Sequence, residues 1–358
     1  MSYIARIAKS CSSICFSDEE LRYYSRHLLL PNIGTNGQRK LKDAHVLVIG
    51  AGGLGCPVLQ ALAGAGVGHL TVIDGDAVAV SNISRQWLHR FTDVGLNKAV
   101  SAQQQLVGLN PYIEVVPVPE MLDSANARDW IAAHDLVIDA TDDLDVRYLI
   151  DDMCAELERP WVHAALYREN SQLCVFWAKY GVRFRDLFPE PTEAPSCAGA
   201  GMLGAVASVV ANLQALEAIK LIVGQGSLKL GTLISIHAAT HQIQAFQLPG
   251  GGVPPVFEGD KLPAHLWTVD QWRQAQSIGQ SLRVIDLRSQ ADFSEGSLPS
   301  SEHITAEAIL EDGLVDDGSA NVLLVCAEGL VSSLLADALR SRGQTNVFHL
   351  EGGFQALA

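Results

Sequence analysis

A glycine-rich segment near residue 50 constrains the fold of this 358-residue chain more than any other feature. The run Gly50-Ala51-Gly52-Gly53-Leu54-Gly55 follows the apolar stretch 45–49 and precedes apolar residues at helical spacing. A short apolar run of this kind is typical of a buried parallel strand. Glycines between a strand and a helix let the backbone approach a phosphate, which the free N–H groups of the helix N-terminus can bind. The segment therefore predicts a nucleotide-binding α/β domain, although the motif alone is weak support.

Strand and helix patterns alternate through the first half of the chain. Further strands are predicted at 70–73, 113–116 and 135–139, and helices at 99–109 and 147–157. This alternation predicts a Rossmann-like, mostly parallel sheet. After Pro160, strands at 172–178 and 232–237 flank a Pro- and Gly-rich connection and a long helix that ends near Val223.

A cluster of turn-forming residues at 249–255 separates this region from a second, smaller α/β module. Strands are predicted there at 282–285, 322–325 and 347–350, with a helix at 330–339. A module of about 100 residues is long enough to fold alone. We therefore expect an N-terminal extension (1–20), a nucleotide-binding domain (21–248), a linker (249–261) and a C-terminal domain (262–358).

Composition restricts the partners and the compartment. Hydrophobic residues make up 48% of the chain, which excludes a wholly disordered protein. A net charge of -15 disfavours nucleic acid and anionic membranes as partners. The seven cysteines are dispersed, no CxxC pair occurs, and no signal peptide or membrane span is recognised. These features predict a cytoplasmic protein with reduced thiols.

Charged side chains follow the glycine-rich turn in an order that suits a nucleoside triphosphate. Asp74 and Asp76 come at the end of the next strand, where an acidic group binds ribose hydroxyls in dinucleotide folds. Arg85 and Lys98 follow, and they could neutralise the charge of a triphosphate. The pair Asp142-Asp143 ends a later strand and suits Mg²⁺ held jointly with phosphates, although it could also cap the next helix.

A nicotinamide oxidoreductase is the alternative that the glycine-rich turn and Asp74 leave open. That alternative does not explain why Arg85, Lys98 and Asp142 occur together. A carrier-docking scaffold without enzymatic activity is a third hypothesis, and the complete set of nucleotide-binding residues counts against it.

The region from about Leu21 to Phe246 resembles the ubiquitin-activating-like adenylyltransferases, specifically sulfur-carrier activators of the MoeB/ThiF type. The motifs that carry the resemblance come in order: 22–31, 37–42, 50–55, 81–86, 110–111, 141–143 and 213–220. The resemblance implies ATP- and Mg²⁺-dependent adenylation of the C-terminal glycine of a small ubiquitin-like sulfur carrier protein ending in Gly-Gly. It also implies a homodimer, because the family is dimeric.

The resemblance also implies roles for individual residues. Gly53 with its neighbours Gly50 and Gly52 would hold the phosphates, Asp74 the ribose, Asn82, Arg85 and Lys98 the triphosphate, and Asp142 the Mg²⁺; Asp76, Ser81 and Asp143 are grouped with them as nucleotide-binding residues. Arg26 matches an arginine that reaches the triphosphate of the neighbouring subunit. Cys197 matches a loop cysteine that forms an acyl link to the carrier or serves in sulfur transfer, with a plain packing role as the alternative.

One departure from the family pattern concerns its structural zinc, which two CxxC pairs hold in many members. Arg183 and Asp186 stand where the first pair of cysteines would be, and no cysteine occurs in 250–258, where the second would be. We therefore expect no structural zinc. A pairing between Arg183 and Asp186 is the hypothesis for what replaces it.

The C-terminal module, from about Leu262 to Ala358, resembles a rhodanese-like domain. The matching segments are 282–288, 292–293, 325–333 and 347–354, with Cys326 in the position of the nucleophile. The resemblance implies that Cys326 passes persulfide sulfur, from a cysteine desulfurase or another donor, to the adenylated carrier to give a thiocarboxylate. Val331 replaces the usual arginine and Glu328 adds a negative charge. A degenerate domain used for docking therefore remains the alternative.

Overall fold

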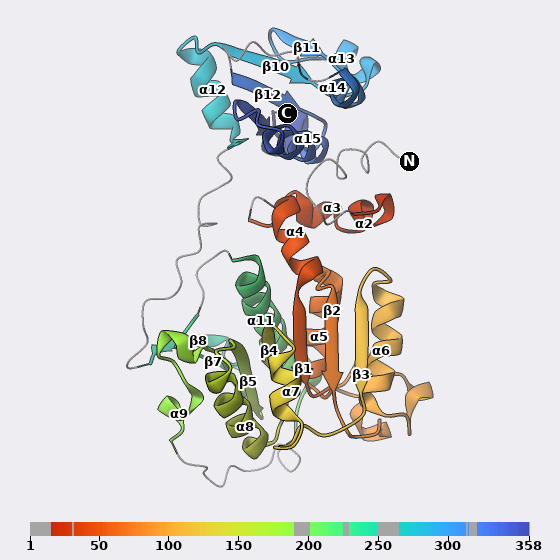
Figure 1. Ribbon diagram of the computed structural model, residues 1–358, viewed down its shortest axis with the longest axis vertical. Coiled ribbons are helices and arrows are strands. Elements are labelled where there is room, and N and C mark those ends of the chain that lie inside the picture. The colour runs from red at the N-terminus through yellow and green to blue at the C-terminus, as the bar shows by residue number, and fades with distance from the viewer. Residues whose placement is uncertain are drawn as a thin grey trace. The chain divides into compact units, whose positions relative to one another are not determined.

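The computed structural model describes residues 16–30, 32–189, 201–224, 229–248, 265–312, 314 and 321–357 (Figure 1). Its contacts divide the chain into two compact units. One unit is Lys40–Phe257, and the other combines Met1–Arg39 with Glu258–Ala358. Each unit has a sheet of its own.

The unit Lys40–Phe257 is built on an eight-stranded sheet in the order β3-β2-β1-β4-β5-β6-β7-β8. Its strands are β1 (His45–Ile49), β2 (His69–Ile73), β3 (Glu114–Val118), β4 (Leu136–Asp139), β5 (Trp161–Tyr167), β6 (Asn170–Phe176), β7 (Thr232–His237) and β8 (Gln242–Gln247). The strands β3, β2, β1, β4 and β5 run parallel, whereas β6, β7 and β8 add as antiparallel neighbours. The central strands β1 and β4 are buried almost throughout, as expected for parallel strands covered on both faces.

Helices connect the parallel strands and place two helix N-termini at the carboxyl edge of the sheet. The helices of this unit are α5 (Gly55–Ala65), α6 (Lys98–Leu109), α7 (Ala127–Ala132), α8 (Leu144–Glu156), α9 (Phe184–Leu187) and α11 (Gly204–Val223), with 3-10 turns η1 (Val80–Asn82), η2 (Phe91–Asp93) and η3 (Ala178–Tyr180). Helix α4 (Gly34–Asp43) precedes β1, and its first six residues are assigned to the other unit. Helix α5 follows β1 and α8 follows β4, so their first turns open on the same edge. Helix α8 begins three residues earlier than the pattern predicted, because Asp143 caps it.

Helix α11 is the single described helix that is long and apolar enough to cross a membrane. It packs against α5 and against β5 and β6, and half of its most apolar window is buried (Figure 1). Its Gln214 side chain donates to the backbone carbonyls of Asp139 and Val162 at 2.7 and 2.8 Å. A buried core helix has the same composition as a membrane span, so this helix is weak support for a membrane protein.

Ion pairs join α8 to the segment around α9, which contains Arg183 and Asp186. Arg183 Nη2 is 2.9 Å from Asp151 Oδ2 and 2.8 Å from Asp152 Oδ1. Arg185 adds a two-pronged contact to Asp152. The expected side-chain pair of Arg183 with Asp186 is wrong, because Asp186 accepts from the backbone N–H of Arg183 as a helix cap. Across the described ranges, no group of three or more His, Cys, Asp or Glu side chains could hold a metal.

The other unit contains a five-stranded parallel sheet in the order β11-β10-β12-β13-β9. Its elements are α2 (Asp18–Tyr23), α3 (Ser25–Leu28), β9 (Leu266–Trp267), α12 (Val269–Ser277), β10 (Leu282–Asp286), α13 (Gln290–Glu295), β11 (Ser301–His303), α14 (Ala306–Asp312), β12 (Asn321–Val325), α15 (Leu330–Ser341), β13 (Val347–Leu350) and the 3-10 turn η5 (Gly353–Leu357). Alternate residues of β12 enter different cores: Val322 and Leu324 join one cluster, and Leu323 and Val325 join the other. Both faces of the sheet are therefore covered, as the two-residue period of a strand requires.

The expected fold class is confirmed. The first sheet is mostly parallel with an antiparallel extension, and the second is a smaller parallel α/β sheet. Both end at a carboxyl edge from which loops and helix N-termini emerge, and ligands of open α/β sheets bind at such edges.

Candidate functional site

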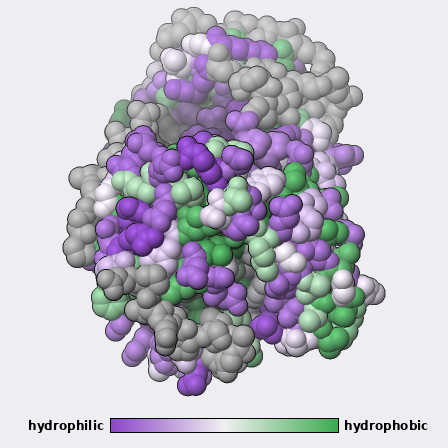
Figure 2. All heavy atoms as spheres, turned by 60° about the horizontal axis from the view of Figure 1, so that its bottom comes forward, coloured by the Kyte–Doolittle hydropathy of each residue, from purple (hydrophilic) through white to green (hydrophobic). Residues whose placement is uncertain are grey.

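A cavity of about 550 Å³ opens at the carboxyl edge of β1, β2 and β4. Figure 2 brings this edge forward and shows apolar side chains in its middle with hydrophilic ones around them. The lining combines the glycine-rich turn with the segments after β2, β3 and β4 and with Gly201 and Met202, which precede α11. Its size and its mixture of apolar and charged groups suit a nucleotide.

The glycine-rich turn is shaped by close backbone approaches. Gly50 has a φ of 101°, and a Cβ there would lie 2.7 Å from the carbonyl oxygen of Ala140. A Cβ on Gly55 would lie only 2.0 Å from the carbonyl oxygen of Gly50. Gly52 is different, because the nearest atom to its added Cβ is 3.7 Å away. Gly50 and Gly55 are thus required by the fold of the turn, whereas Gly52 leaves open space on the cavity side.

Two buried side chains hold this turn from behind. Asp74 Oδ2 accepts from the N–H of Ala51 at 2.8 Å, and Asp74 Oδ1 accepts from the N–H of Asp76 at 2.9 Å. The His89 ring contacts the carbonyl oxygen of Ala51 at 2.9 Å and Ser101 Oγ at 2.8 Å. Burial lowers the pKa of His89, so its ring is neutral near pH 7.

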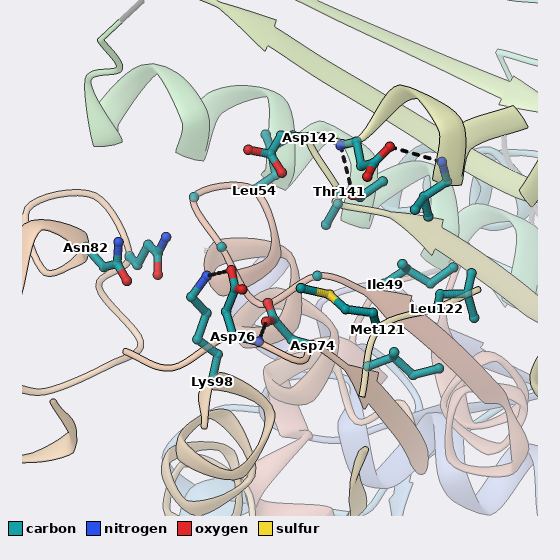
Figure 3. Close-up of a pocket in the computed structure, with 18 of the residues that line it drawn as sticks. Ile49, Leu54, Asp74, Asp76, Asn82, Lys98, Met121, Leu122, Thr141 and Asp142 are labelled. Carbon is teal, nitrogen blue, oxygen red and sulfur yellow. Dashed lines mark hydrogen bonds and ion pairs between the residues drawn. The ribbon is translucent and has the colours of Figure 1, made fainter. Parts of the chain in front are cut away.

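Lys98 brings a cation to the cavity next to the acidic strand end. It is the first residue of α6, whose N-cap Asn97 accepts from the N–H groups of Ala99 and Val100. Its Nζ lies 2.7 Å from Asp76 Oδ2 (Figure 3). The Lys98 side chain is 10% exposed, so its ammonium is largely desolvated and a phosphate there would interact strongly with it.

The turn η1 and the residues directly after it place Asn82, Arg85 and Gln86 along the cavity. Asn82 Oδ1 accepts from the N–H of Ala79 at 2.9 Å, and Arg85 Nη1 donates to the carbonyl oxygen of Ser81 at 2.9 Å. Ser81 itself does not line the cavity. Ser81 contributes to the site through its backbone carbonyl, which accepts from Arg85 and so orients that side chain.

The two carboxylates after β4 have different surroundings. Asp143 Oδ1 accepts from the N–H groups of Asp145 and Val146, so Asp143 is the N-cap of α8. Asp142 lines the cavity, and its carboxylate has no hydrogen bond or ion pair with any residue that the structure describes (Figure 3). The capping alternative therefore applies to Asp143, and Asp142 is the carboxylate available to a ligand.

The second unit carries a separate loop around Cys326, which follows β12. The buried Cys326 Sγ accepts from the N–H groups of Gly329 at 3.1 Å and Ser332 at 3.4 Å. The Ser332 hydroxyl lies 3.4 Å from the same sulfur. Gly329 has a φ of 89°, which turns the loop into the N-terminus of α15. The backbone thus surrounds the sulfur with donors that suit a negative charge.

Residues 24–251 match the ThiF family, and residues 268–358 match the rhodanese-like domain. The chain belongs to the ThiF family. The chain is 35% identical over 373 residues to "Probable adenylyltransferase/sulfurtransferase MoeZ" of Mycobacterium tuberculosis (strain ATCC 25618 / H37Rv), covering 96% of this chain and 94% of that protein. "Adenylyltransferase and sulfurtransferase MOCS3" of Culex quinquefasciatus is 34% identical, with 95% and 87% covered.

A third relative matches the first domain alone. "Sulfur carrier protein adenylyltransferase" of Thermus thermophilus is 43% identical over 227 residues, with 61% of this chain and 84% of that protein covered. Together these relatives identify the ThiF-family chain as an enzyme of the adenylyltransferase/sulfurtransferase kind.

Solved structures share the fold at low sequence identity. E. coli MccB with MccA-N7isoASN has a TM-score of 0.59 and 22% identity, with 67% of this chain and 74% of that chain covered. E. coli MccB with ATP has a TM-score of 0.54 and 22% identity, with 70% and 74% covered. These likenesses place the ThiF-family fold and are too remote to assign ligands.

The cavity of the ThiF-family unit brings together most of the residues that the sequence singled out. Its lining includes Gly50, Gly52, Gly53, Asp74, Asp76, Asn82, Arg85, Lys98, Asp142 and Asp143. Arg26 and Cys326 belong to the other unit, where Arg26 Nη1 lies 3.6 Å from Glu328 Oε2. Cys197 lies outside the described residues.

Sequence reasoning missed several residues of the cavity wall. Arg147 lines the cavity from the first turns of α8, and Met121, Leu122, Leu166 and Met202 belong to its apolar part. The apolar residues carry no chemical signal of their own. Arg147 could have been noticed, because it lies one helical turn after the carboxylates once α8 is known to begin at Leu144.

The remaining described thiols lie in the core, as expected for Cys56 and Cys154. All four described cysteines are free. Burial raises the pKa of Cys56 to about 12, and it also raises the pKa values of Cys154 and Cys174 well above the ordinary value. These three thiols are therefore inert at neutral pH.

Proposed function

We propose that this enzyme uses ATP and Mg²⁺ to adenylate the C-terminal glycine carboxylate of a ubiquitin-like sulfur carrier protein. It then transfers sulfur to give a thiocarboxylate. One observation carries the first step: a glycine-rich turn, the cations Lys98 and Arg85, and the unpaired carboxylate of Asp142 line one cavity. The carrier is proposed from the printed name of the Thermus thermophilus relative and from the family resemblance.

Adenylation requires little acid or base catalysis here. A carboxylate oxygen of the carrier attacks the α-phosphorus of ATP, and pyrophosphate leaves with the electron pair of the broken P–O bond. The carboxylate is already ionised, so positioning and charge neutralisation supply most of the acceleration. Lys98 and Arg85 would neutralise phosphate oxygens, and the backbone around Gly52 and Gly53 would approach the phosphates without a side chain between.

The donor set fits Mg²⁺ held jointly with phosphates. Mg²⁺ is usually bound in such sites through one or two carboxylates plus substrate oxygens. Asp142 offers a carboxylate that is free of partners within the described ranges, whereas Asp76 is engaged by Lys98. When bound, the ion would neutralise charge on the triphosphate.

Sulfur transfer would use Cys326. A persulfide on this residue attacks the carbonyl carbon of the acyl-adenylate and expels AMP, which leaves an acyl disulfide. A second thiol, for which Cys197 is the candidate, then breaks the S–S bond, releases the thiocarboxylate and remains in a disulfide with Cys326. The two backbone N–H groups at Sγ suit the anionic persulfide. A cysteine desulfurase is the proposed donor.

A second function for the rhodanese-like domain, carrier docking without sulfur transfer, is favoured by Glu328 and Val331 in the loop. Incubation with a cysteine desulfurase and cysteine, followed by persulfide labelling, separates the two. We expect label on the wild type and none on Cys326→Ala. Label that is equal in both proteins, or absent from both, contradicts transfer through Cys326.

The adenylation step is tested by ATP–pyrophosphate exchange with a carrier that ends in Gly-Gly. We expect exchange only when the carrier and Mg²⁺ are both present, and none with a carrier lacking the last glycine. Exchange without any carrier, or reduction of NAD in its place, contradicts the proposal. A Cys197→Ala variant should retain exchange and lose any covalent carrier adduct.

We also propose a homodimer in which Arg26 completes the site of the partner subunit. Mixing Arg26→Ala with Lys98→Met subunits tests this arrangement. Each variant alone should be inactive, and mixed dimers should regain exchange because one site then has both residues. If mixed dimers are shown to form and ATP–pyrophosphate exchange does not recover, the proposed arrangement is wrong.

The proposed domain boundaries are 21–248 and 262–358, joined by a linker at 249–261. We place the enzyme in the cytoplasm, which agrees with four free thiols within the described part of the chain. Nucleic acid and membranes are not among the proposed partners.

A further inference from the structure

A fully buried carboxylate ends β4 three residues before Asp142. Asp139 is 0% exposed, and its two oxygens have three donors. Oδ1 accepts from the N–H of Thr141 at 3.1 Å, and Oδ2 accepts from Arg147 Nε at 3.0 Å and contacts His163 Nδ1 at 2.7 Å. A buried carboxylate with this many partners has a fixed orientation.

Arg147 makes a second contact with the loop that follows β4. Its Nη2 donates to the carbonyl oxygen of Thr141, while its Nε holds Asp139. The N–H of Thr141 is bound by Asp139, and its Oγ1 accepts from the N–H of Asp143 at 3.0 Å. Every polar group of Thr141 is therefore engaged in the loop.

Asp142 thus lies between two immobilised neighbours. Thr141 is held on one side by Asp139 and Arg147, and Asp143 is held on the other by its capping of α8. Of the acidic side chains in this loop, Asp142 is the one whose carboxylate lines the cavity without a partner within the described ranges. This arrangement restricts the backbone and leaves one ligand group available, as outer-shell residues do around metal sites.

His163 supports Asp139 from the side away from the cavity. The ring is fully buried, lies among Trp161, Phe176 and Phe184, and does not line the cavity. Burial lowers the pKa of His163, so the neutral ring donates from Nδ1 and leaves Arg147 as the cation that balances Asp139. A change at His163 can reach the cavity through Asp139.

We propose that Arg147 and His163 are positioning residues that act through Asp139 and Thr141 to aim the Asp142 carboxylate at Mg²⁺ bound with ATP. The inference rests on the proposed function, because it assumes that Asp142 is a metal ligand. It adds two residues that act on the metal through other residues. Arg147 also lines the cavity, so the test has to separate positioning from a direct phosphate contact. Loosening them should weaken binding of the Mg²⁺ complex and spare binding of free nucleotide.

Fluorescent ATP-analogue binding to the full chain, measured in Mg²⁺ and in EDTA, tests this proposal. Arg147→Met should weaken binding in Mg²⁺ by about tenfold or more and leave binding in EDTA within about twofold. His163→Phe should also weaken binding in Mg²⁺ more than binding in EDTA, by a smaller factor than Arg147→Met does. Arg85→Ala is the matched control, because a direct phosphate contact should weaken binding in both conditions.

A double-mutant cycle supplies the decisive comparison. If Arg147 acts through Asp142, then Asp142→Asn with Arg147→Met should bind the Mg²⁺ complex no more weakly than Asp142→Asn alone. Additive losses, or an equal loss in EDTA, would show that Arg147 binds phosphate directly and would overturn the inference. Arg147→Lys and His163→Phe, with melting temperatures measured for each, cover the case in which Arg147→Met does not fold.

The two proposals fail in different ways. If Asp142→Asn does not change the ratio of the affinities in Mg²⁺ and in EDTA, Asp142 is not the metal ligand, and the positioning role is then wrong as well. If Asp142→Asn weakens binding in Mg²⁺ alone, and neither Arg147→Lys nor His163→Phe does so, only the positioning role is wrong.

Discussion

The Lys98 ammonium lies 2.7 Å from the Asp76 carboxylate at the mouth of the nucleotide cavity. The Asp76 side chain is 55% exposed and the Lys98 side chain is far more buried. Asp74, two residues earlier, binds backbone N–H groups of the glycine-rich turn instead. Two acidic residues that follow the same strand therefore have different tasks, one toward the cation and one toward the backbone.

Lys98→Met is expected to lower ATP–pyrophosphate exchange by about 100-fold or more, because it removes a desolvated cation from the phosphate site. Asp76→Asn keeps the Lys98 cation and removes only its partly exposed carboxylate partner, so the exchange rate should fall by less than about tenfold. Exchange rates at saturating ATP check both, with melting temperatures as the folding control. Losses of equal size in the two variants would contradict this division of tasks.

Gly50 and Gly52 should respond differently to alanine. Gly50→Ala adds a Cβ at a φ of 101° and 2.7 Å from a carbonyl oxygen, so the protein should unfold at a clearly lower temperature. Gly52→Ala meets nothing closer than 3.7 Å, so its melting temperature should stay near that of the wild type while ATP binding weakens. Thermal unfolding with and without ATP measures both effects. Normal ATP binding by Gly52→Ala would contradict a phosphate at that turn.

The ion pairs between α8 and α9 should contribute to stability. Asp151 is almost fully buried and accepts from the N–H of Phe184 and from Arg183. Asp151→Ala leaves the N–H of Phe184 without its acceptor and removes one of the two carboxylates that bind Arg183, so the free energy of unfolding should fall by about 3 kcal/mol. Asp186→Ala removes a helix-cap contact at the same place and should cost about 1 kcal/mol. Urea unfolding gives both values, and a larger cost at Asp186 would refute the assignment.

Acid should destabilise the rhodanese-like unit through His349. Burial lowers the pKa of His349 to about 4, below its ordinary value of 6.5. The unfolded chain therefore binds more protons between these two values, and the free energy of unfolding falls as the pH drops through that window. The loss by pH 4 should be about 3 kcal/mol.

His349→Phe should flatten this pH dependence. The variant removes the titrating ring, and the neighbouring His265 and Asp337 remain as the matched background. Unfolding curves of wild type and variant at pH 7 and pH 4.5 provide the comparison. A slope that is unchanged in the variant would assign the acid sensitivity to another group.

Much of the nucleotide site could be predicted because its signals are local. The turn 50–55 requires glycine for steric reasons, and charged residues directly after apolar strands meet at one edge of a parallel sheet. Asp139 escaped this reasoning, because it resembles the end of a strand until its contacts with Arg147 and His163 are known. His163 comes from a different strand, and its pairing with Asp139 depends on the register of β4 with β5.

The partners of Arg183, in the segment without the zinc-binding cysteines, could not be predicted from the local sequence either. Arg183 and Asp186 are close in sequence, which suggested a pair, yet the guanidinium binds Asp151 and Asp152 more than thirty positions earlier. Long-range partners of this kind are set by how α8 packs beside α9, and no spacing rule reports that packing.

The contacts around Cys326 bear on how the enzyme should be assayed. Its sulfur is surrounded by main-chain donors, which are independent of side-chain identity. Glu328 on the same loop lies 3.6 Å from Arg26, and its negative charge is expected to disfavour a small anion arriving from solvent wherever that arginine is engaged elsewhere. A thiosulfate assay therefore measures the approach of an anion past Glu328 and says little about the capacity of Cys326 to hold sulfur. A donor protein that docks on the loop and delivers sulfur by direct thiol exchange avoids that barrier. Such a donor is the appropriate substrate for judging whether the domain is active.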